Sequence, residues 1–155
     1  MKKTKKVCFI CSGGGHFEQI RQLDTVAAKY KHYYVLPRNS STAKFKDKKY
    51  LVTDIYRKRR FAFIWQLAIT SIEQLMIFIK EMPDVVISTG AGVAYPTFIL
   101  TKIFRKKLIY IESFARMKTL NKTGEKVYPI ADLFMVQWSN LLEKVPKAVY
   151  VGWIY

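Results

Sequence analysis

Acidic side chains are scarce in this sequence, which has 11 Asp and Glu against 27 Lys and Arg over 155 residues. The resulting formal charge of +16 predicts an anionic partner, either a nucleic acid, an acidic lipid or a phosphorylated substrate. Half of the residues are nonetheless hydrophobic and 15% are aromatic, which excludes a disordered basic tail. The length predicts a single domain over residues 1–155.

Cysteine and histidine are also rare, with two of each. Cys8 and Cys11 have the spacing of a redox motif, but in a strand residues three apart point to opposite faces. Neither His16 nor His32 is spaced to complete a metal site with them. The sequence therefore predicts a reduced, cytosolic protein without a disulfide or a bound metal. No secretory signal is predicted either, because the apolar run Val7–Cys11 is too short.

Short apolar runs rich in Val, Ile, Phe and Tyr alternate with segments of helical periodicity along the chain. The predicted strands are Val7–Cys11, Tyr33–Leu36, Tyr50–Val52, Val85–Ser88, Leu108–Ile111, Leu133–Val136 and Ala148–Val151. Helical segments are predicted over 17–27, 61–79, 96–104 and 141–145, and a loop with one short helix over 38–49. This alternation predicts an α/β fold with a Rossmann-like, doubly wound parallel sheet.

The segment 61–79 is long and apolar enough to be considered for a membrane. A continuous span is disfavoured by Glu73, since an acidic residue in mid-span costs about 3 kcal/mol. A basic cluster precedes the segment, and this combination is typical of a helix that lies in the membrane interface. We expect such a helix, with a core helix or a true span as the alternatives. The residues expected to contact the membrane are Arg57, Lys58, Arg59, Arg60, Phe63, Leu67 and Phe78.

A glycine-rich turn, Ser12–His16, separates the first predicted strand from the first helix. Such a turn can offer backbone N–H groups to an anion or a sugar hydroxyl. It matches neither the dinucleotide-binding nor the Walker pattern, so no bound cofactor is predicted. His16 is either a general base or an exposed residue that only caps the helix.

A second turn of this kind, Ser88–Pro96, follows the fourth predicted strand. In the common strand order 3-2-1-4-5, strands one and four are neighbours, and ligands bind in the crevice where the order reverses. Glu112, Ser113 and Arg116 follow the fifth strand at the same edge. The carboxylate and the guanidinium are either a general base and an anion clamp or simply a salt bridge.

Four segments together resemble one family of proteins. They are Val7–Gln19, Ile87–Pro96, Ile111–Gly124 and Phe134–Trp138, of which the stretch Glu112–Arg116 is the most specific. They are similar to the acceptor-side subunit of split GT-B glycosyltransferases. This family includes the membrane-anchoring subunit of the eukaryotic dolichol-linked GlcNAc transferase and small bacterial capsular and exopolysaccharide proteins. The glycine turns are more distantly similar to those of the N-terminal domain of MurG-type enzymes.

The resemblance implies half of an enzyme, equivalent to the N-terminal half of a GT-B glycosyltransferase and active only with its partner. This half would lie at the cytoplasmic face of an anionic membrane, as a peripheral or monotopic protein, and bind a lipid-pyrophosphate-linked sugar acceptor. A separate catalytic subunit would bind most of the UDP-sugar, and no metal would be needed. His16 or Glu112 would accept the proton. The substrate-binding residues would be Ser12, Gly13, Gly14, Gly15, Thr89, Gly90, Gly92, Ser113 and Arg116.

Two other functions remain as alternatives. A basic RNA-binding domain would explain the charge, but most aromatic residues fall inside the strand and helix patterns, so a nucleic acid is not the expected partner. A stand-alone nucleotide-binding enzyme would need a phosphate or ribose motif that the sequence lacks. The apolar C-terminal segment Val151–Tyr155 is expected to be covered, since an exposed apolar patch usually marks an interface.

Overall fold

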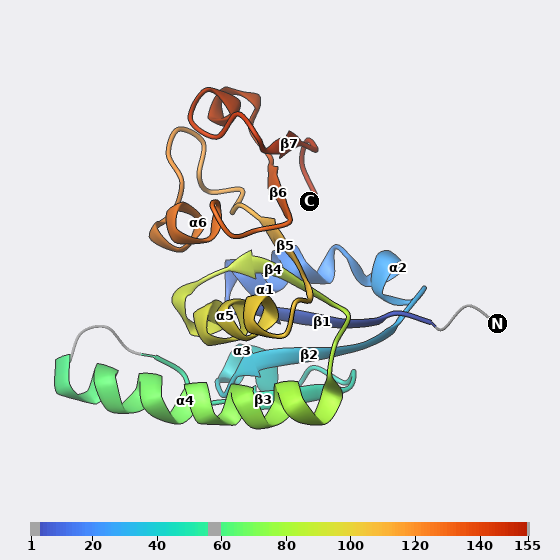
Figure 1. Cartoon of the computed structure of the whole chain (residues 1–155), viewed down its shortest axis with the longest axis vertical. Helices are drawn as coiled ribbons and strands as arrows, with labels where there is room; N and C mark the ends of the chain where they lie inside the picture. The colour runs from blue at the N-terminus through green and yellow to red at the C-terminus, as the bar shows by residue number, and fades with distance from the viewer. Residues whose placement is uncertain (1–3, 56–59, 155) are drawn as a thin grey trace.

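The computed structural model describes residues 4–55 and 60–154. Within these residues the chain forms one seven-stranded parallel sheet in the order β3-β2-β1-β4-β5-β6-β7, which Figure 1 shows from one side. The strands are β1 (Lys6–Cys11), β2 (Lys31–Pro37), β3 (Lys49–Val52), β4 (Val85–Gly90), β5 (Lys107–Ile111), β6 (Leu133–Val136) and β7 (Val149–Tyr150). Every predicted strand is therefore confirmed within a few residues at its ends, as is the fold class.

Helices cover both faces of the sheet. On one face lie α1 (Gly15–Arg21) and α2 (Asp24–Ala27), and on the other α4 (Arg60–Glu81), α5 (Tyr95–Ile103) and α6 (Lys122–Val127). The shorter elements are α3 (Ser40–Ala43), η1 (Gly92–Ala94) and η2 (Ser139–Glu143). The sequence did not predict α6, because it has only six residues, one of them a glycine.

The two apolar layers follow from side-chain alternation along buried strands. In β1, Cys8 and Ile10 pack toward the layer with α4 and α5, whereas Phe9 and Cys11 pack toward α1. The two cysteines therefore lie on opposite faces, as predicted, and both are free thiols. Burial raises the pKa of Cys8 to about 12, so its thiol stays protonated.

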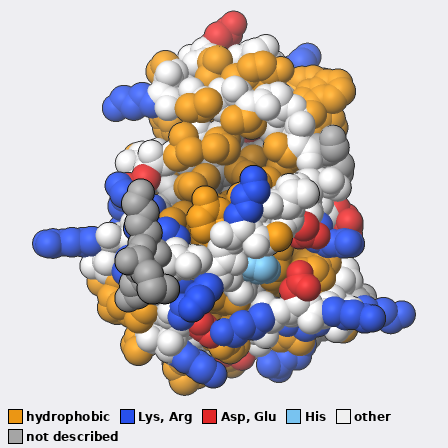
Figure 2. Space-filling model, turned by 90° about the vertical axis from the view of Figure 1, so that its right-hand side faces the viewer, with side chains coloured by type: hydrophobic (Ala, Val, Ile, Leu, Met, Phe, Trp, Pro, Cys, Tyr) orange, Lys and Arg blue, Asp and Glu red, His pale blue; other side chains and the backbone are white. Residues whose placement is uncertain are grey.

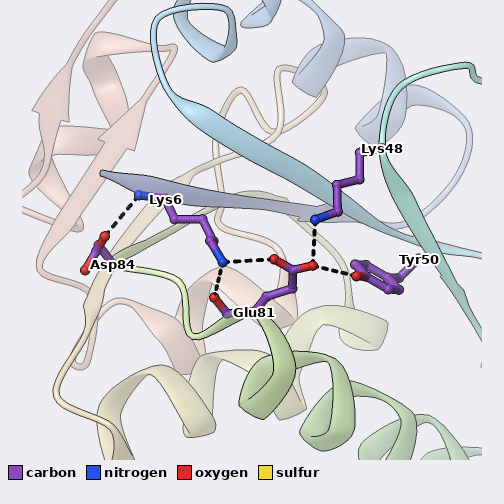
Figure 3. A network of polar contacts seen from close by, with 5 residues as sticks. All are labelled: Lys6, Lys48, Tyr50, Glu81 and Asp84. Carbon is purple, nitrogen blue, oxygen red and sulfur yellow. Dashed lines mark hydrogen bonds and ion pairs between the residues drawn. The ribbon is translucent and has the colours of Figure 1, made fainter. Parts of the chain in front are cut away.

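A buried carboxylate fixes the C-terminal end of α4 to the sheet. Glu81 accepts hydrogen bonds from Lys48 Nζ at 2.7 Å, from Lys6 Nζ at 3.1 Å and from the Tyr50 hydroxyl at 2.5 Å. Figure 3 shows these groups converging on Glu81, with Asp84 accepting a hydrogen bond from the backbone N–H of Lys6 at 3.0 Å. Helix α4 is therefore joined to both β1 and β3 at this end.

Helix α4 buries a polar stripe against the protein and exposes most of its apolar residues. Thr70 and Gln74 are buried, and Glu73 accepts a 2.6 Å hydrogen bond from the backbone N–H of Thr53. The outward residues are 38–71% exposed: Ile64, Trp65, Ile69, Ile72, Leu75, Met76 and Ile79. Only 17% of the apolar window within 62–81 is buried, although this segment is long and apolar enough to cross a membrane. Within this chain, α4 is therefore not an ordinary core helix.

Three predicted membrane contacts need correction or refinement. Phe78 is 2% exposed and its ring lies 5.2 Å from that of Phe104, so the prediction that it contacts a membrane is wrong. It follows Gln74 by four residues and therefore shares its inward face. Phe63 and Leu67 are half-buried and line the groove described below. Arg57, Lys58 and Arg59 lie outside the described residues, as does the side chain of Arg60.

Candidate functional site

A groove of about 1180 Å³ opens at the carboxyl edge of the sheet, where the segments after β1, β3, β4 and β5 meet the first turns of α4. Its polar lining residues are Ser12, His16, Asp54, Arg116, Asn121, Lys122, Thr123 and Lys126. Its apolar lining residues are Ile55, Phe63, Ile64, Leu67, Val93 and Tyr95, and Ala91 and Gly92 complete the lining. This is the crevice that the strand order predicts.

His16 joins the two glycine turns. Its Nδ1 lies 2.7 Å from the carbonyl oxygen of Thr89, and the Thr89 hydroxyl donates to the carbonyl of His16 at 2.7 Å. Because a carbonyl only accepts, Nδ1 carries the proton and Nε2 keeps a lone pair. Burial lowers the pKa of His16, and the nearby positive charge of Arg116 lowers it further. The imidazole is therefore neutral near pH 7 and is suited to accept a proton.

The second glycine turn is held in a strained conformation. Gly90 has φ +112°, and a Cβ there would lie 2.9 Å from the Tyr110 hydroxyl, so the position requires glycine. Ala91 follows with φ 91° and ψ 168°, a region that is essentially restricted to glycine. Strain of this kind persists only where surrounding contacts enforce it, and it is concentrated at functional sites.

Glu112 lies behind the groove and does not line it. Its carboxylate is fully buried and accepts hydrogen bonds from the backbone N–H groups of Ser113 at 2.7 Å and Asn121 at 3.2 Å, and from the Asn121 side chain. Burial raises the pKa of Glu112 to about 7, although these hydrogen bonds lower it. A Cβ on Gly124 would overlap Oε2 of this carboxylate, so the packing allows only glycine there.

Asn121 connects Glu112 to helix α6, which lines the groove. Its Oδ1 accepts hydrogen bonds from the backbone N–H groups of Thr123 at 2.8 Å and Gly124 at 2.7 Å, which caps α6. The cap orients α6 so that Lys122 and Lys126, one helical turn apart, both line the groove. Glu112 is therefore connected to the groove through Asn121 and α6.

Three cations line the groove. Arg116 was predicted from the sequence, whereas Lys122 and Lys126 were missed. Lys126 also lies over the Tyr95 ring, with Nζ 5.8 Å from the ring centroid. The sequence signal for these lysines was their position, since Lys122 lies within the resembling stretch Ile111–Gly124 and Lys126 lies two residues after it.

The predicted site residues fall into two groups. Ser12, His16, Gly92 and Arg116 line the groove, whereas Gly13, Gly14, Gly15, Thr89, Gly90, Glu112 and Ser113 do not. The Thr89 side chain is buried and bonded to His16, so it positions that residue and is not free to contact a ligand. Between Glu112 and Arg116 no ion pair is present in the described part of the chain, so the predicted alternative of a salt bridge is wrong.

This arrangement suits an amphipathic anion. The cationic side chains can bind phosphate oxygens, and the apolar lining continues onto the exposed face of α4 through Ile64, which is 63% exposed. A neutral His16 stands at the same site, able to accept a proton from a hydroxyl group.

Solved structures share this fold. The chain superposes on Acinetobacter baumannii MurG with a TM-score of 0.68 at 15% identity, covering 88% of this chain and 42% of that one. It superposes on UDP-N-acetylglucosamine 2-epimerase from Rickettsia bellii with a TM-score of 0.74 at 13% identity, covering 98% of this chain and 46% of that one. The fold is thus that of the N-terminal half of GT-B glycosyltransferases, and the chain spans less than half the length of these structures.

The family model described as "Oligosaccharide biosynthesis protein Alg14 like" matches residues 6–154, so the chain belongs to this family. A human relative, "UDP-N-acetylglucosamine transferase subunit ALG14", is 25% identical over 97% of this chain and 83% of its own length. The Candida albicans protein of the same name is 29% identical over 98% of this chain and 82% of its own length.

Proposed function

We propose that the chain is the acceptor-binding subunit of a heteromeric, UDP-sugar-dependent glycosyltransferase. The observation that carries this proposal is the groove, which is lined both by three cations and by apolar residues of α4, one of which, Ile64, also belongs to the exposed face of that helix. A lipid-pyrophosphate-linked sugar has the matching chemistry, since its pyrophosphate would meet Arg116, Lys122 and Lys126. Its lipid would lie along Phe63, Ile64 and Leu67.

The exposed face of α4 supports attachment at the cytoplasmic face of a membrane. A helix with its apolar side outward and polar side satisfied within the protein has the properties of an interface-lying helix. The basic residues 57–60 would interact with anionic lipid headgroups. We propose a peripheral or monotopic attachment in which the groove opens next to the lipid surface.

The reaction would be a direct displacement. The acceptor hydroxyl would attack the anomeric carbon of the UDP-sugar, UDP would leave with the electrons of the broken glycosidic bond, and the hydroxyl proton would pass to Nε2 of His16. Glu112 would support this step by holding Asn121 and α6 in place. It is also the alternative to His16 as the proton acceptor. Most of the UDP-sugar would be bound by a separate catalytic subunit.

Docking of that subunit is supported by an apolar surface near the C-terminus. Val149, Tyr150, Val151 and Trp153 are 38–62% exposed, and the Trp153 ring lies 5.4 Å from that of Trp138. Figure 2 shows hydrophobic side chains gathered on the upper half of the molecule, the part that contains β6 and β7. Aromatic residues in such a patch are typical of the centre of a protein interface.

The product that we propose is a capsular polysaccharide or an exopolysaccharide. This part of the proposal rests on the resemblance to small bacterial polysaccharide proteins, and the relatives reported above are eukaryotic transferase subunits. Analysis of the lipid-linked product would distinguish a bacterial capsular polysaccharide or exopolysaccharide from the product of a eukaryotic transferase.

Reconstituted transfer tests the proposal. The chain would be combined with the candidate catalytic subunit, UDP-GlcNAc and isoprenyl-pyrophosphoryl-GlcNAc in anionic vesicles. We expect lipid-linked product only when both subunits are present. Full activity of either subunit alone would contradict the division into an acceptor half and a donor half.

A further inference from the structure

The buried side chain of Gln74 links α4 to the strained turn of the groove. Its amide is 1% exposed and is saturated with hydrogen bonds. Nε2 donates to the carbonyl of Val93 at 2.7 Å and to the Thr70 hydroxyl at 3.1 Å. Oε1 accepts from the backbone N–H of Thr97 at 3.0 Å and from the Thr97 hydroxyl at 2.7 Å. One amide thus bonds to both sides of the η1–α5 junction.

These contacts fix the exit of the turn that starts at Gly90. The residue at the N-cap position of α5, Ala94, provides no side-chain hydrogen bond, and Gln74 satisfies the Thr97 N–H from a different helix. The entrance of the same turn is fixed by His16 at the Thr89 carbonyl. Strained Ala91 therefore lies between two hydrogen-bonded positions. Thr89 is held by His16 from one side of the sheet, and Val93 is held by Gln74 from the other.

We propose that Gln74 is a positioning residue of the acceptor site, which holds the turn Gly90–Val93 in its ligand-binding geometry and couples it to α4. This role rests on the proposed function, because Ala91, Gly92 and Val93 of the turn line the groove. The outward face of the same helix carries the exposed apolar residues, including Met76 and Ile79. A displacement of α4 at the lipid surface would therefore move the backbone that lines the groove.

Burial alone does not require this residue type. A Leu or Met at 74 would fill an interface between two helices, but it would leave the Val93 carbonyl and the Thr97 N–H without the hydrogen bonds that Gln74 makes. The strained Ala91 conformation would then lose one of the contacts that enforce it.

Binding of geranylgeranyl pyrophosphate in detergent micelles, measured by titration calorimetry on the whole chain, tests the assignment. Gln74→Met removes all four hydrogen bonds at similar volume. Thr97→Val is the milder variant, because it removes one hydroxyl and keeps the backbone N–H. Thr101→Val is the matched control, since the Thr101 hydroxyl is equally buried and donates to the Thr97 carbonyl at 2.6 Å, one turn away from the groove.

We expect Gln74→Met to raise the Kd about tenfold or more at unchanged stoichiometry, Thr97→Val to raise it less, and Thr101→Val to leave it within about twofold. Partial misfolding would lower the stoichiometry and leave the Kd unchanged, so the two effects are separable. Amide hydrogen exchange without ligand should accelerate at 91–94 in Gln74→Met and not in Thr101→Val. An unchanged Kd in a folded Gln74→Met protein would overturn the assignment. Absence of binding by the wild-type chain would instead contradict the proposed function on which it rests.

Discussion

His16 and Thr89 exchange two hydrogen bonds of 2.7 Å across 73 residues of sequence, one from the ring Nδ1 to the Thr89 carbonyl and one from the Thr89 hydroxyl to the His16 carbonyl. The pair joins the turn after β1 to the turn after β4. It also determines the tautomer of His16, because only a protonated Nδ1 can donate to a carbonyl.

Substitution His16→Asn tests the assignment of the base. The Asn amide can still donate to the Thr89 carbonyl, so we expect a small change in stability. The kcat should fall by about 10²–10⁴, the usual contribution of a general base. Steady-state kinetics with the catalytic subunit present would measure this, and an unchanged kcat would assign the proton transfer to another group.

The pH profile separates His16 from Glu112. Burial lowers the pKa of His16 below its ordinary value of 6.5, so a reaction that uses it should stay active to below pH 6.5 and fail only at lower pH. Burial raises the pKa of Glu112 to about 7, so a reaction that uses its carboxylate should already lose activity as the pH falls through about 7. The kcat should follow the first profile.

Removal of the groove lysines tests the binding of phosphate. For Lys122→Gln with Lys126→Gln, we expect acceptor affinity to fall about tenfold or more, since a charge-assisted hydrogen bond contributes about 1.5–3 kcal/mol. Lys29→Gln is the control, because Lys29 is equally exposed but does not line the groove. Equal effects of the double variant and the control would exclude a specific phosphate site.

Helix α4 allows a paired test of membrane attachment. The double variant Ile72→Asn with Met76→Gln should weaken sedimentation with anionic vesicles and leave the melting temperature nearly unchanged, because both residues are outward and about 60% exposed. Phe78→Ala should do the reverse, with a loss of about 3–5 kcal/mol of stability from a cavity in the core. Retained vesicle binding by the double variant would contradict the role of this face.

The Glu81 cluster predicts a specific loss of stability in acid. Burial alone would raise the pKa of Glu81, but hydrogen bonds from Lys48, Tyr50 and Lys6 outweigh burial and lower this pKa from 4.5 to about 2. Its contribution to the free energy of unfolding is therefore complete above about pH 4.5 and is lost as the pH falls toward 2.

Urea denaturation of Glu81→Gln measures this contribution. We expect a loss on the order of 2 kcal/mol at pH 7 that diminishes between pH 4.5 and pH 2. Glu18→Gln is the control, because Glu18 forms an exposed pair with Arg21 at 3.9 Å, and pairs of this kind contribute at most about 1 kcal/mol. A pH-independent loss would mean that packing, and not charge, is responsible.

The sequence predicted the strands and their order because buried parallel strands are continuous apolar runs that end at glycine turns. It could not orient α4, because this helix is apolar almost all round and periodicity alone does not say which side faces the protein. Thr70 and Gln74 face inward since the buried side of the helix meets the polar η1–α5 junction. Phe78 was misassigned for the same reason.

The site was predicted less completely than the fold. Residues at the ends of β1 and β4 were located because the topology brings these ends together, and His16 and Arg116 do line the groove. Glu112 was placed at the right edge, but a sequence does not indicate that Asn121 covers its carboxylate. The lysines of α6 were missed because a helix of six residues has too little periodicity to be recognised.

The proposed function requires this chain to bind the lipid-linked acceptor and not the nucleotide sugar. The most direct measurement is the binding of each substrate to the isolated chain, with isoprenyl-pyrophosphoryl-GlcNAc in anionic vesicles and UDP-GlcNAc in solution. We predict saturable binding of the lipid-linked sugar, with an affinity that falls about tenfold or more in the Lys122→Gln, Lys126→Gln variant, and no comparable binding of UDP-GlcNAc. Tight binding of UDP-GlcNAc without binding of the lipid-linked sugar would contradict the account.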